Sequence, residues 1–271
     1  MQHPLASLAV FALLAATLHA QDPSTPGPPP APPQQTPPAS FCAQEPGERR
    51  VSVGLLPKNI LCDQKNIWLF PIRAPHHRRW IPALAVISFT AVLVATDAHS
   101  AGYFHRTTSF QGFNSVFTGM STGVGIGLAP VSLLLAGTIG KHPYTQKTAL
   151  LAGEAMADSA ILSTIVKDLG RRARPQDYPA NARLTDSWFT NSGGVLKGIG
   201  SFPSTHTILA FSAATVIARR YSRHRWVPYV AYGLSGLVGF SRLTQSAHFP
   251  SDVFMGAALG YGIGRFAVLR N

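Results

Sequence analysis

The segment S-R-L-T-Q-S-A-H-F-P-S-D, residues 241–252, joins two apolar stretches of the chain. If a helix begins near Pro250, Asp252 lies about one helical turn beyond His248. A carboxylate in that position can hold one imidazole nitrogen and leave the other free to attack a substrate. The planar guanidinium of Arg242 is suited to two phosphate oxygens. Taken alone, the segment fits a basic loop with a hydrogen-bonded histidine equally well, because a histidine near an aspartate is common.

Two further segments place polar residues at the ends of apolar stretches. K-D-L-G-R-R-A-R-P, residues 167–175, closes one stretch, and S-F-P-S-T-H, residues 201–206, opens another. Pro203 suits the first turn of a helix, where free backbone N–H groups can bind an anion. The three segments together supply three cations, two imidazoles and one carboxylate, a set that suits a phosphate ester.

The three segments together resemble the signature motifs of the type 2 phosphatidic acid phosphatase and vanadium haloperoxidase superfamily. Lysine, six residues and Arg-Pro occur at residues 167–175, and Ser-Arg, five residues, His, three residues and Asp occur at residues 241–252. The middle motif, Pro-Ser-Gly-His, is matched at residues 203–206 except that Thr205 stands where the family has glycine. A β-branched residue there is expected either to crowd the phosphate or to add a hydroxyl donor. The resemblance covers residues 80–271.

The resemblance implies a metal-independent reaction with a phosphohistidine intermediate. His248 attacks phosphorus, Asp252 orients His248, and His206 protonates the leaving oxygen and then activates water. No cofactor is implied, and the sequence shows no cluster of residues with metal-ligand spacing. The residues expected to bind the phosphate are Lys167, Arg174, Ser204, Thr205 and Arg242.

Composition predicts a membrane protein. Of 271 residues only 13% are charged and 46% are hydrophobic, and the charged share is about half that of a typical soluble protein. The net charge of +12 fits cytoplasmic loops and an anion site, and no nucleic-acid-binding motif is visible.

Six apolar stretches predict an all-α fold, a six-helix membrane bundle. Glycines recur every four residues at 119, 123 and 127 and again at 256, 260 and 264; we interpret both stripes as packing features. Glu154 and Asp158 lie within one stretch and are expected to pair helices. The predicted spans are 81–96, 116–140, 148–167, 203–218, 226–240 and 250–268.

The residues before the bundle divide into three regions by composition. Residues 1–20 predict a signal peptide or an uncleaved anchor, residues 21–48 a Pro-rich linker, and residues 49–79 a basic, aromatic segment on a membrane surface. The helical phosphatase domain then covers residues 80–271. Cys42 and Cys62 can form a disulfide if they are exported; otherwise they stay free thiols.

With six spans, all three motifs fall on one membrane face. The opposite face carries more lysines and arginines, so the positive-inside rule places the site outside the cytoplasm of a bacterial-type inner membrane. A cleaved signal peptide would give the opposite orientation. The long connection at residues 176–202 suits a lid or a substrate-binding loop, or is a tolerated insertion.

We therefore expect an enzyme that hydrolyses a lipid phosphomonoester or pyrophosphate, such as phosphatidic acid, phosphatidylglycerophosphate or a polyprenyl pyrophosphate. Its partners are the lipid phosphate and the membrane, and no nucleic acid. The alternatives are a periplasmic non-specific acid phosphatase, a haloperoxidase, and a catalytically weak lipid-binding envelope protein. The sequence leaves the oligomeric state open.

Overall fold

The computed structural model describes residues 41–42, 48–73, 80–179, 182–192, 194 and 196–269. Within these residues the chain is helical and contains no strand, which confirms the predicted all-α class. Residues 42–271 form one compact unit. The predicted signal peptide or anchor and nearly all of the Pro-rich linker lie outside the described residues.

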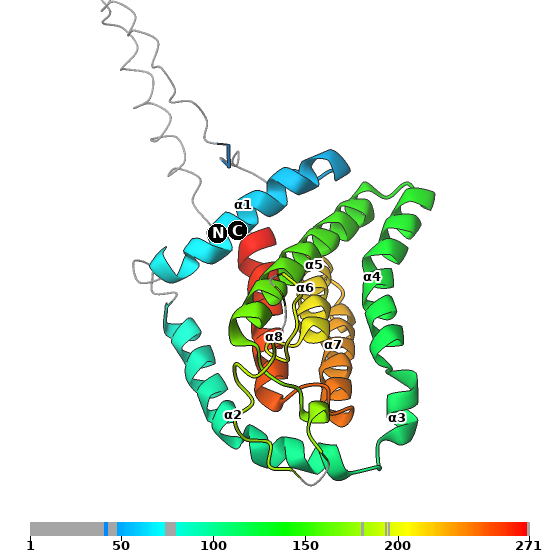
Figure 1. The fold of residues 1–271 in the computed structure, drawn as a ribbon. Helices are drawn as coiled ribbons and strands as arrows, with labels where there is room; N and C mark the ends of the chain where they lie inside the picture. Colours follow the sequence, from blue (N-terminus) through cyan, green and yellow to red (C-terminus); the bar gives the residue numbers. More distant parts are fainter. Residues whose placement is uncertain are drawn as a thin grey trace, which may run out of the picture. The chain divides into compact units, whose positions relative to one another are not determined.

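All six predicted spans are helical (Figure 1). The 3-10 helices are η1 (Val53–Leu55) and η3 (Pro175–Asp177), and a π-helical turn, η4 (Ile263–Val268), continues the last helix. The α-helices are α1 (Leu56–Arg73), α2 (Trp80–Arg106), α3 (Gln111–Val116), α4 (Gly119–Ile139), α5 (Pro143–Gly170), α6 (Thr205–Arg220), α7 (Trp226–Thr244) and α8 (Pro250–Gly262).

Local sequence explains where several helices begin and end. Pro143 and Pro250 occupy first-turn positions of α5 and α8, where a missing N–H costs no helical hydrogen bond. The Thr118 side chain caps α4 by accepting a hydrogen bond from the Ser121 N–H. α5 ends at Gly170, and the next residue, Arg171, adopts a left-handed conformation with φ of 42°.

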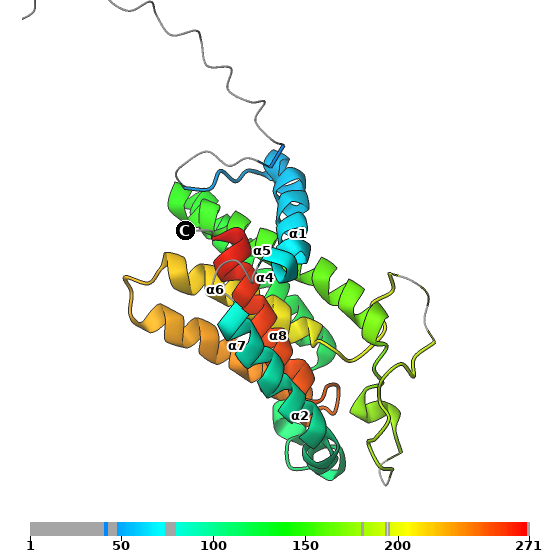
Figure 2. The ribbon, with the colours of Figure 1, turned by 90° about the vertical axis from the view of Figure 1, so that its left-hand side faces the viewer.

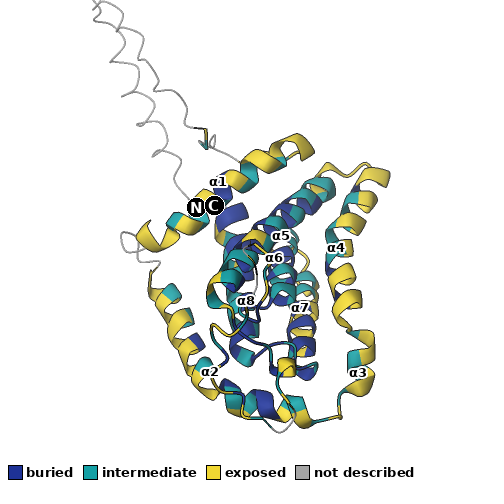
Figure 3. Cartoon of the chain, viewed as in Figure 1, coloured by how far each residue is buried: buried dark blue, intermediate teal, exposed yellow. Residues whose placement is uncertain are grey.

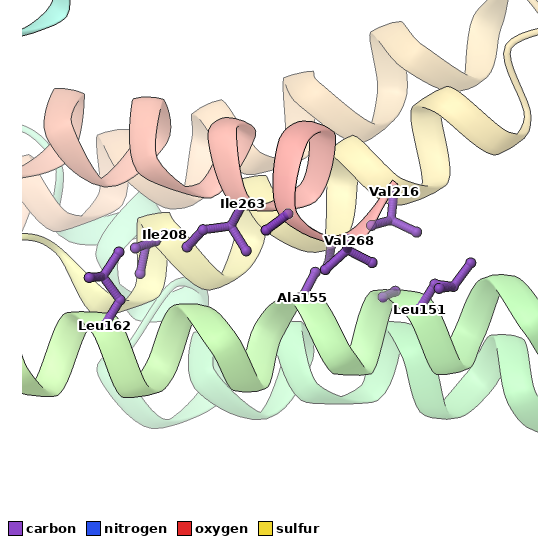
Figure 4. Packing of buried hydrophobic residues seen from close by; sticks show 10 residues of the cluster. Leu151, Ala155, Leu162, Ile208, Val216, Ile263 and Val268 are labelled. Carbon is purple, nitrogen blue, oxygen red and sulfur yellow. The ribbon is translucent and has the colours of Figure 1, made fainter. Parts of the chain in front are cut away.

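Helix α6 is the centre of the bundle and packs against α5, α7 and α8. Figure 4 shows the apolar side chains that fill the space between α5, α6 and the end of α8. Burying each large aliphatic side chain contributes about 1.5–3 kcal/mol. The labelled members of this core are Leu151, Ala155, Leu162, Ile208, Val216, Ile263 and Val268.

Helices α2, α4 and α5 are long and apolar enough to cross a membrane. Only 11% of the apolar window of α2 and 17% of that of α4 is buried, against 50% for α5. Figure 3 shows the largely exposed surfaces of α2 and α4. Apolar surface of this extent fits contact with lipid. At 16 residues, α6 is about 24 Å long, shorter than the ~30 Å hydrocarbon core.

Buried charges attach α1 to the bundle. The Arg49 guanidinium pairs with Asp63 of α1 and Glu154 of α5, and Gln64 Nε2 donates to Asp158 Oδ1 at 2.9 Å. These contacts agree with the helix-pairing role expected for Glu154 and Asp158. The three carboxylates lie within 4.8 Å of one another, an arrangement that spacing did not reveal because Asp63 comes from another helix.

A disulfide joins Cys42 and Cys62, so the bonded alternative of the two considered is the one observed. Cys62 belongs to α1. The bond therefore attaches residue 42 to the helix that is itself held to the bundle by Arg49.

The two glycine stripes have different surroundings. A Cβ at Gly256 or Gly260 of α8, or at Gly264 of η4, would lie 2.4–2.9 Å from a backbone carbonyl oxygen of residue 204, 208 or 212. This stripe is a packing feature, as predicted. On α4 the interpretation was wrong, because Gly119 and Gly123 face Arg242 and His206 and a Cβ at Gly127 would meet nothing within 4 Å.

The change Gly260→Ala is expected to destabilise the bundle, because the new methyl carbon would lie 2.4 Å from the Ile208 carbonyl oxygen. Overpacking of this kind costs about 1–3 kcal/mol. Thermal unfolding of purified protein in detergent measures the effect. Gly262→Ala on the same helix is the control, because its Cβ would meet nothing within 4 Å; equal losses in both variants would contradict the packing argument.

Candidate active site

The three predicted motifs meet at the end of the bundle where α8 begins. Lys167 lies in the last turn of α5, His206 in the first turn of α6, and Asp252 in the first turn of α8. The Ser204 N–H donates to the Asp252 carbonyl at 3.0 Å, which joins the second and third motifs directly. Figure 2 shows α8 running from this end toward α1 at the other.

His248 is buried beside the carboxylate of Asp252. Its Nδ1 lies 3.6 Å from Asp252 Oδ2 and 3.4 Å from the Ser201 hydroxyl, which itself donates to Asp252 Oδ2. Within the described part of the chain, Nε2 has no hydrogen-bond partner. The imidazole is thus held on one side and free on the other, the arrangement that an attacking histidine requires.

Burial lowers the pKa of His248 to about 4, although Asp252 acts in the opposite direction. The imidazole is therefore neutral near pH 7. A neutral imidazole has the lone pair that nucleophilic attack requires.

Asp252 accepts more hydrogen bonds than the sequence suggested. Its Oδ2 accepts from the Phe249 N–H at 2.8 Å and from Ser201, and its Oδ1 accepts from Arg172 Nη1 at 2.7 Å. A buried carboxylate is stable only when it is paired and hydrogen-bonded in this way.

Sequence reasoning assigned no role to Arg172, Asp97 or Ser201, all of which are buried at this site. Arg172 lies inside the first motif, two residues before Arg174, and was passed over because it is not one of the motif positions. Asp97 was missed because the predicted span ended at residue 96. A span drawn one residue longer would have contained a carboxylate, which is a signal of function in a membrane helix.

The second histidine, His206, is half-buried and faces the start of α4. Its Nε2 lies 3.0 Å from the Gly119 carbonyl oxygen, so this nitrogen donates and carries a proton. The positive charges of Lys167 and Arg174 act on both His206 and His248. The structure therefore brings both imidazoles within reach of the same two cations.

The three predicted phosphate-binding cations differ in how they are held. Lys167 is buried, and its Nζ donates to the Gly200 carbonyl at 2.9 Å. Arg242 is also buried and donates to the Phe117 carbonyl at 2.7 Å and to Thr122 Oγ1 at 3.1 Å. The Arg174 side chain is only partly buried and has no hydrogen bond to any described residue.

At the start of α6, Ser204 and Thr205 have partners inside the bundle. Ser204 Oγ accepts from Thr207 at 2.9 Å, and Thr205 Oγ1 lies 2.9 Å from Ser163 Oγ on α5. The Thr205 hydroxyl is thus engaged by α5. Among the described residues nothing accepts from the N–H groups of Thr205 and His206, which stay available to an anion.

The long connection between α5 and α6 lies along the end of α5. Its residues 187–191 form backbone hydrogen bonds with residues 170–173, among them Ala173 N–H to the Ser187 carbonyl at 2.7 Å. The ring of Trp188 stacks on the Arg172 guanidinium, 4.6 Å from ring centroid to Cζ. This part of the connection therefore packs against the end of α5 and holds Arg172 in place.

Comparisons with known proteins show what the C-terminal part of the chain is similar to. Residues 148–270 match the model of the PAP2 superfamily. The match includes all three motifs and begins inside α5, so it is shorter than the range 80–271 expected from the motifs.

Individual PAP2 relatives align with parts of the chain. It is 32% identical over 122 residues to the decaprenylphosphoryl-5-phosphoribose phosphatase of Mycobacterium tuberculosis, covering 45% of this chain and 60% of that protein. It is 40% identical over 65 residues to the lipid A 1-phosphatase of Porphyromonas gingivalis, covering 24% of this chain and 15% of that protein. The chain thus spans less than two thirds of the length of these relatives.

One solved structure is similar, a transmembrane PAP2-type phosphatidylglycerolphosphate phosphatase from Bacillus subtilis. It is 21% identical, with a TM-score of 0.49 over 68% of this chain and 92% of that chain.

The change Thr205→Val is expected to lower stability by about 1 kcal/mol, the usual value of one hydrogen bond, because it removes the contact with Ser163 at nearly constant volume. KM for a phosphate ester should stay the same, since the hydroxyl faces α5. Thermal unfolding and steady-state kinetics on the same preparation check both expectations. A several-fold rise in KM would show instead that the hydroxyl binds the phosphate.

Proposed function

We propose that the protein is a membrane lipid phosphatase that hydrolyses a phosphomonoester or pyrophosphate through a phosphohistidine intermediate. The observation that carries the proposal is the surroundings of His248. Its Nδ1 faces Asp252 and Ser201, no described residue is hydrogen-bonded to Nε2, and the positive charges of Lys167 and Arg174 act on the ring. Its PAP2 relatives include phosphatases of a decaprenyl-linked sugar phosphate and of lipid A. The exposed apolar helices α2 and α4 favour a substrate drawn from the bilayer.

In the proposed reaction the phosphate lies between the cations and the start of α6. Lys167, Arg174 and Arg242 neutralise its oxygens, and the free N–H groups at residues 205 and 206 add two donors. Ser204 contributes its hydroxyl proton, because its oxygen already accepts from Thr207.

His248 Nε2 attacks phosphorus, and the bond from phosphorus to the leaving oxygen breaks. His206, protonated on both nitrogens, gives the proton of Nδ1 to that oxygen, while Nε2 stays bonded to the Gly119 carbonyl. The neutral ring then takes a proton from water. The water oxygen attacks phosphorus, the bond between phosphorus and nitrogen breaks, and phosphate and the free histidine are regenerated. Candidate substrates are phosphatidic acid, phosphatidylglycerophosphate and polyprenyl pyrophosphates, and the proposed reaction requires no metal.

The proposed location is a bacterial-type inner membrane with the site facing the periplasm. The loop charges support this orientation. The Cys42–Cys62 disulfide supports the opposite one, because it lies on the other membrane face and disulfides persist in an oxidising compartment. Labelling of free thiols in intact and lysed cells tests the orientation. Thiols at 42 and 62 that are free in cells fit a periplasmic site, and a disulfide that is intact in cells fits a cytoplasmic one.

The change His248→Ala is expected to abolish phosphate release from every substrate, a loss of at least about 10⁴-fold, because it removes the nucleophile. Protein quenched in alkaline denaturant, in which a phosphorus–nitrogen bond survives, should hold phosphate in the parent and none in the variant. His142→Ala, at the distant start of α5, is the control and should keep parental activity. Undiminished turnover in His248→Ala would exclude the proposed mechanism.

The change His206→Ala is expected to slow hydrolysis of an alkyl phosphate by about 10²–10⁴-fold, the usual value of a general acid. An aryl phosphate such as p-nitrophenyl phosphate should lose much less, because its leaving group needs little protonation. The measurement is kcat for the parent and for His206→Ala with each of the two substrates. Equal losses on both would argue against a general acid at this position.

A further inference from the structure

Three buried charged side chains from separate parts of the chain form a continuous series beside His248. Arg172 Nη2 pairs with Asp97 of α2 at 2.7 Å, and Nη1 pairs with Asp252 of α8 at 2.7 Å. All three residues are at most 2% exposed. Asp252 alone touches the histidine, so Asp97 and Arg172 act on His248 only through Asp252.

The guanidinium of Arg172 is held by hydrogen bonds and by two aromatic rings. Besides the two carboxylates, its Nε donates to Ser187 Oγ at 3.1 Å and its Nη1 to Ser251 Oγ at 2.7 Å. The rings of Trp188 and Phe249 lie on it, with centroids 4.6 and 3.9 Å from Cζ. A lysine has neither the planar fork nor the flat faces to satisfy these contacts.

Asp97 is tied to the same turn of α8. Its Oδ1 accepts from the Ser251 N–H at 3.1 Å, and its Oδ2 is hydrogen-bonded to the Ser251 hydroxyl. Helix α2 otherwise exposes most of its apolar window. A buried carboxylate on such a helix needs a reason, because its desolvation is costly.

Charge counting supplies that reason. Arg172 with Asp252 alone would be a neutral pair and would present no net charge to His248. With Asp97 included, the set of three carries one negative charge. The imidazole gains positive charge when it becomes phosphohistidine, so a net negative charge next to it stabilises that state.

We propose that Asp97 and Arg172 are positioning residues for the reaction, which hold Asp252 against His248 and keep one net negative charge beside it. This inference rests on the proposed function. The other groups that act on His248 are the cations Lys167 and Arg174 and the neutral hydroxyl of Ser201. They are the same in the parent and in variants of Asp97 or Arg172.

The test uses charge-changing variants of the full chain in detergent, with the pH profile of kcat/KM as the readout. The acidic limb of the profile reports the loss of a proton from His248 in the free enzyme. Asp97→Asn leaves Arg172 and Asp252 as a neutral pair, which lowers the pKa of His248. We therefore expect the acidic limb to move to lower pH by about half a unit to one unit. Turnover should fall about 10- to 100-fold with little change in KM.

Arg172→Gln is the opposite change and leaves two negative charges, so the limb should move to higher pH. The double variant Asp97→Asn/Arg172→Gln restores one negative charge, and its limb should return toward the parental position. A purely structural role predicts less folded protein in all three variants and no shift of either sign. Arg172→Lys keeps the charge but not the fork, so it should lower turnover without moving the limb far.

Glu154→Gln is the matched control. It removes another buried carboxylate that is paired with an arginine, Arg49, far from the site along α5. It should lower thermal stability and leave the limb unchanged.

The inference would be overturned if the acidic limb stayed at its parental pH in both Asp97→Asn and Arg172→Gln. If turnover still required His248, the proposed function would stand. A parent protein that releases no phosphate from any lipid phosphate would overturn the proposed function and this inference together.

Discussion

The buried carboxylate of Asp252 is the group on which the rest of the site depends. It is fully buried, and a charge in that position must be compensated within the protein because no solvent is available to it. The compensation comes from three groups: the Phe249 backbone N–H, the Ser201 hydroxyl and the Arg172 guanidinium, which also pairs with Asp97 of α2. Satisfying one charge therefore brings α2, the end of α5, the long connection and α8 together.

Close contact of helix backbones supplies the second constraint. Helix α8 and its continuation η4 approach α6 so closely at Gly256, Gly260 and Gly264 that any side chain there would meet the carbonyl oxygen of residue 204, 208 or 212. Ser204 N–H reaches the Asp252 carbonyl as a result. The first turns of the two helices, which carry His206 and Asp252, are then held at a fixed separation. Packing far from the chemistry in this way sets the geometry of the site.

Helix α4 contributes to the site although its sequence shows no catalytic group. Gly119 and Gly123 face Arg242 and His206, and the Phe117 and Gly119 carbonyls contact the same two side chains. A glycine repeat read along the chain has the same appearance whether it faces another backbone or polar side chains. The two stripes differ only in what the fold places opposite them.

The sequence by itself determined the helical class, the positions of the six apolar helices and the three polar segments at their ends, because apolar length and motif spacing are local properties. Those segments also indicated a resemblance to the PAP2 superfamily, whose model matches residues 148–270. Only the tertiary structure decided that Arg172 pairs with both Asp97 and Asp252, that Ser201 donates to Asp252, that Thr205 faces Ser163, and that Cys42 bonds to Cys62. These contacts link residues far apart in sequence, and their partners are chosen by packing and by the need to compensate buried charge.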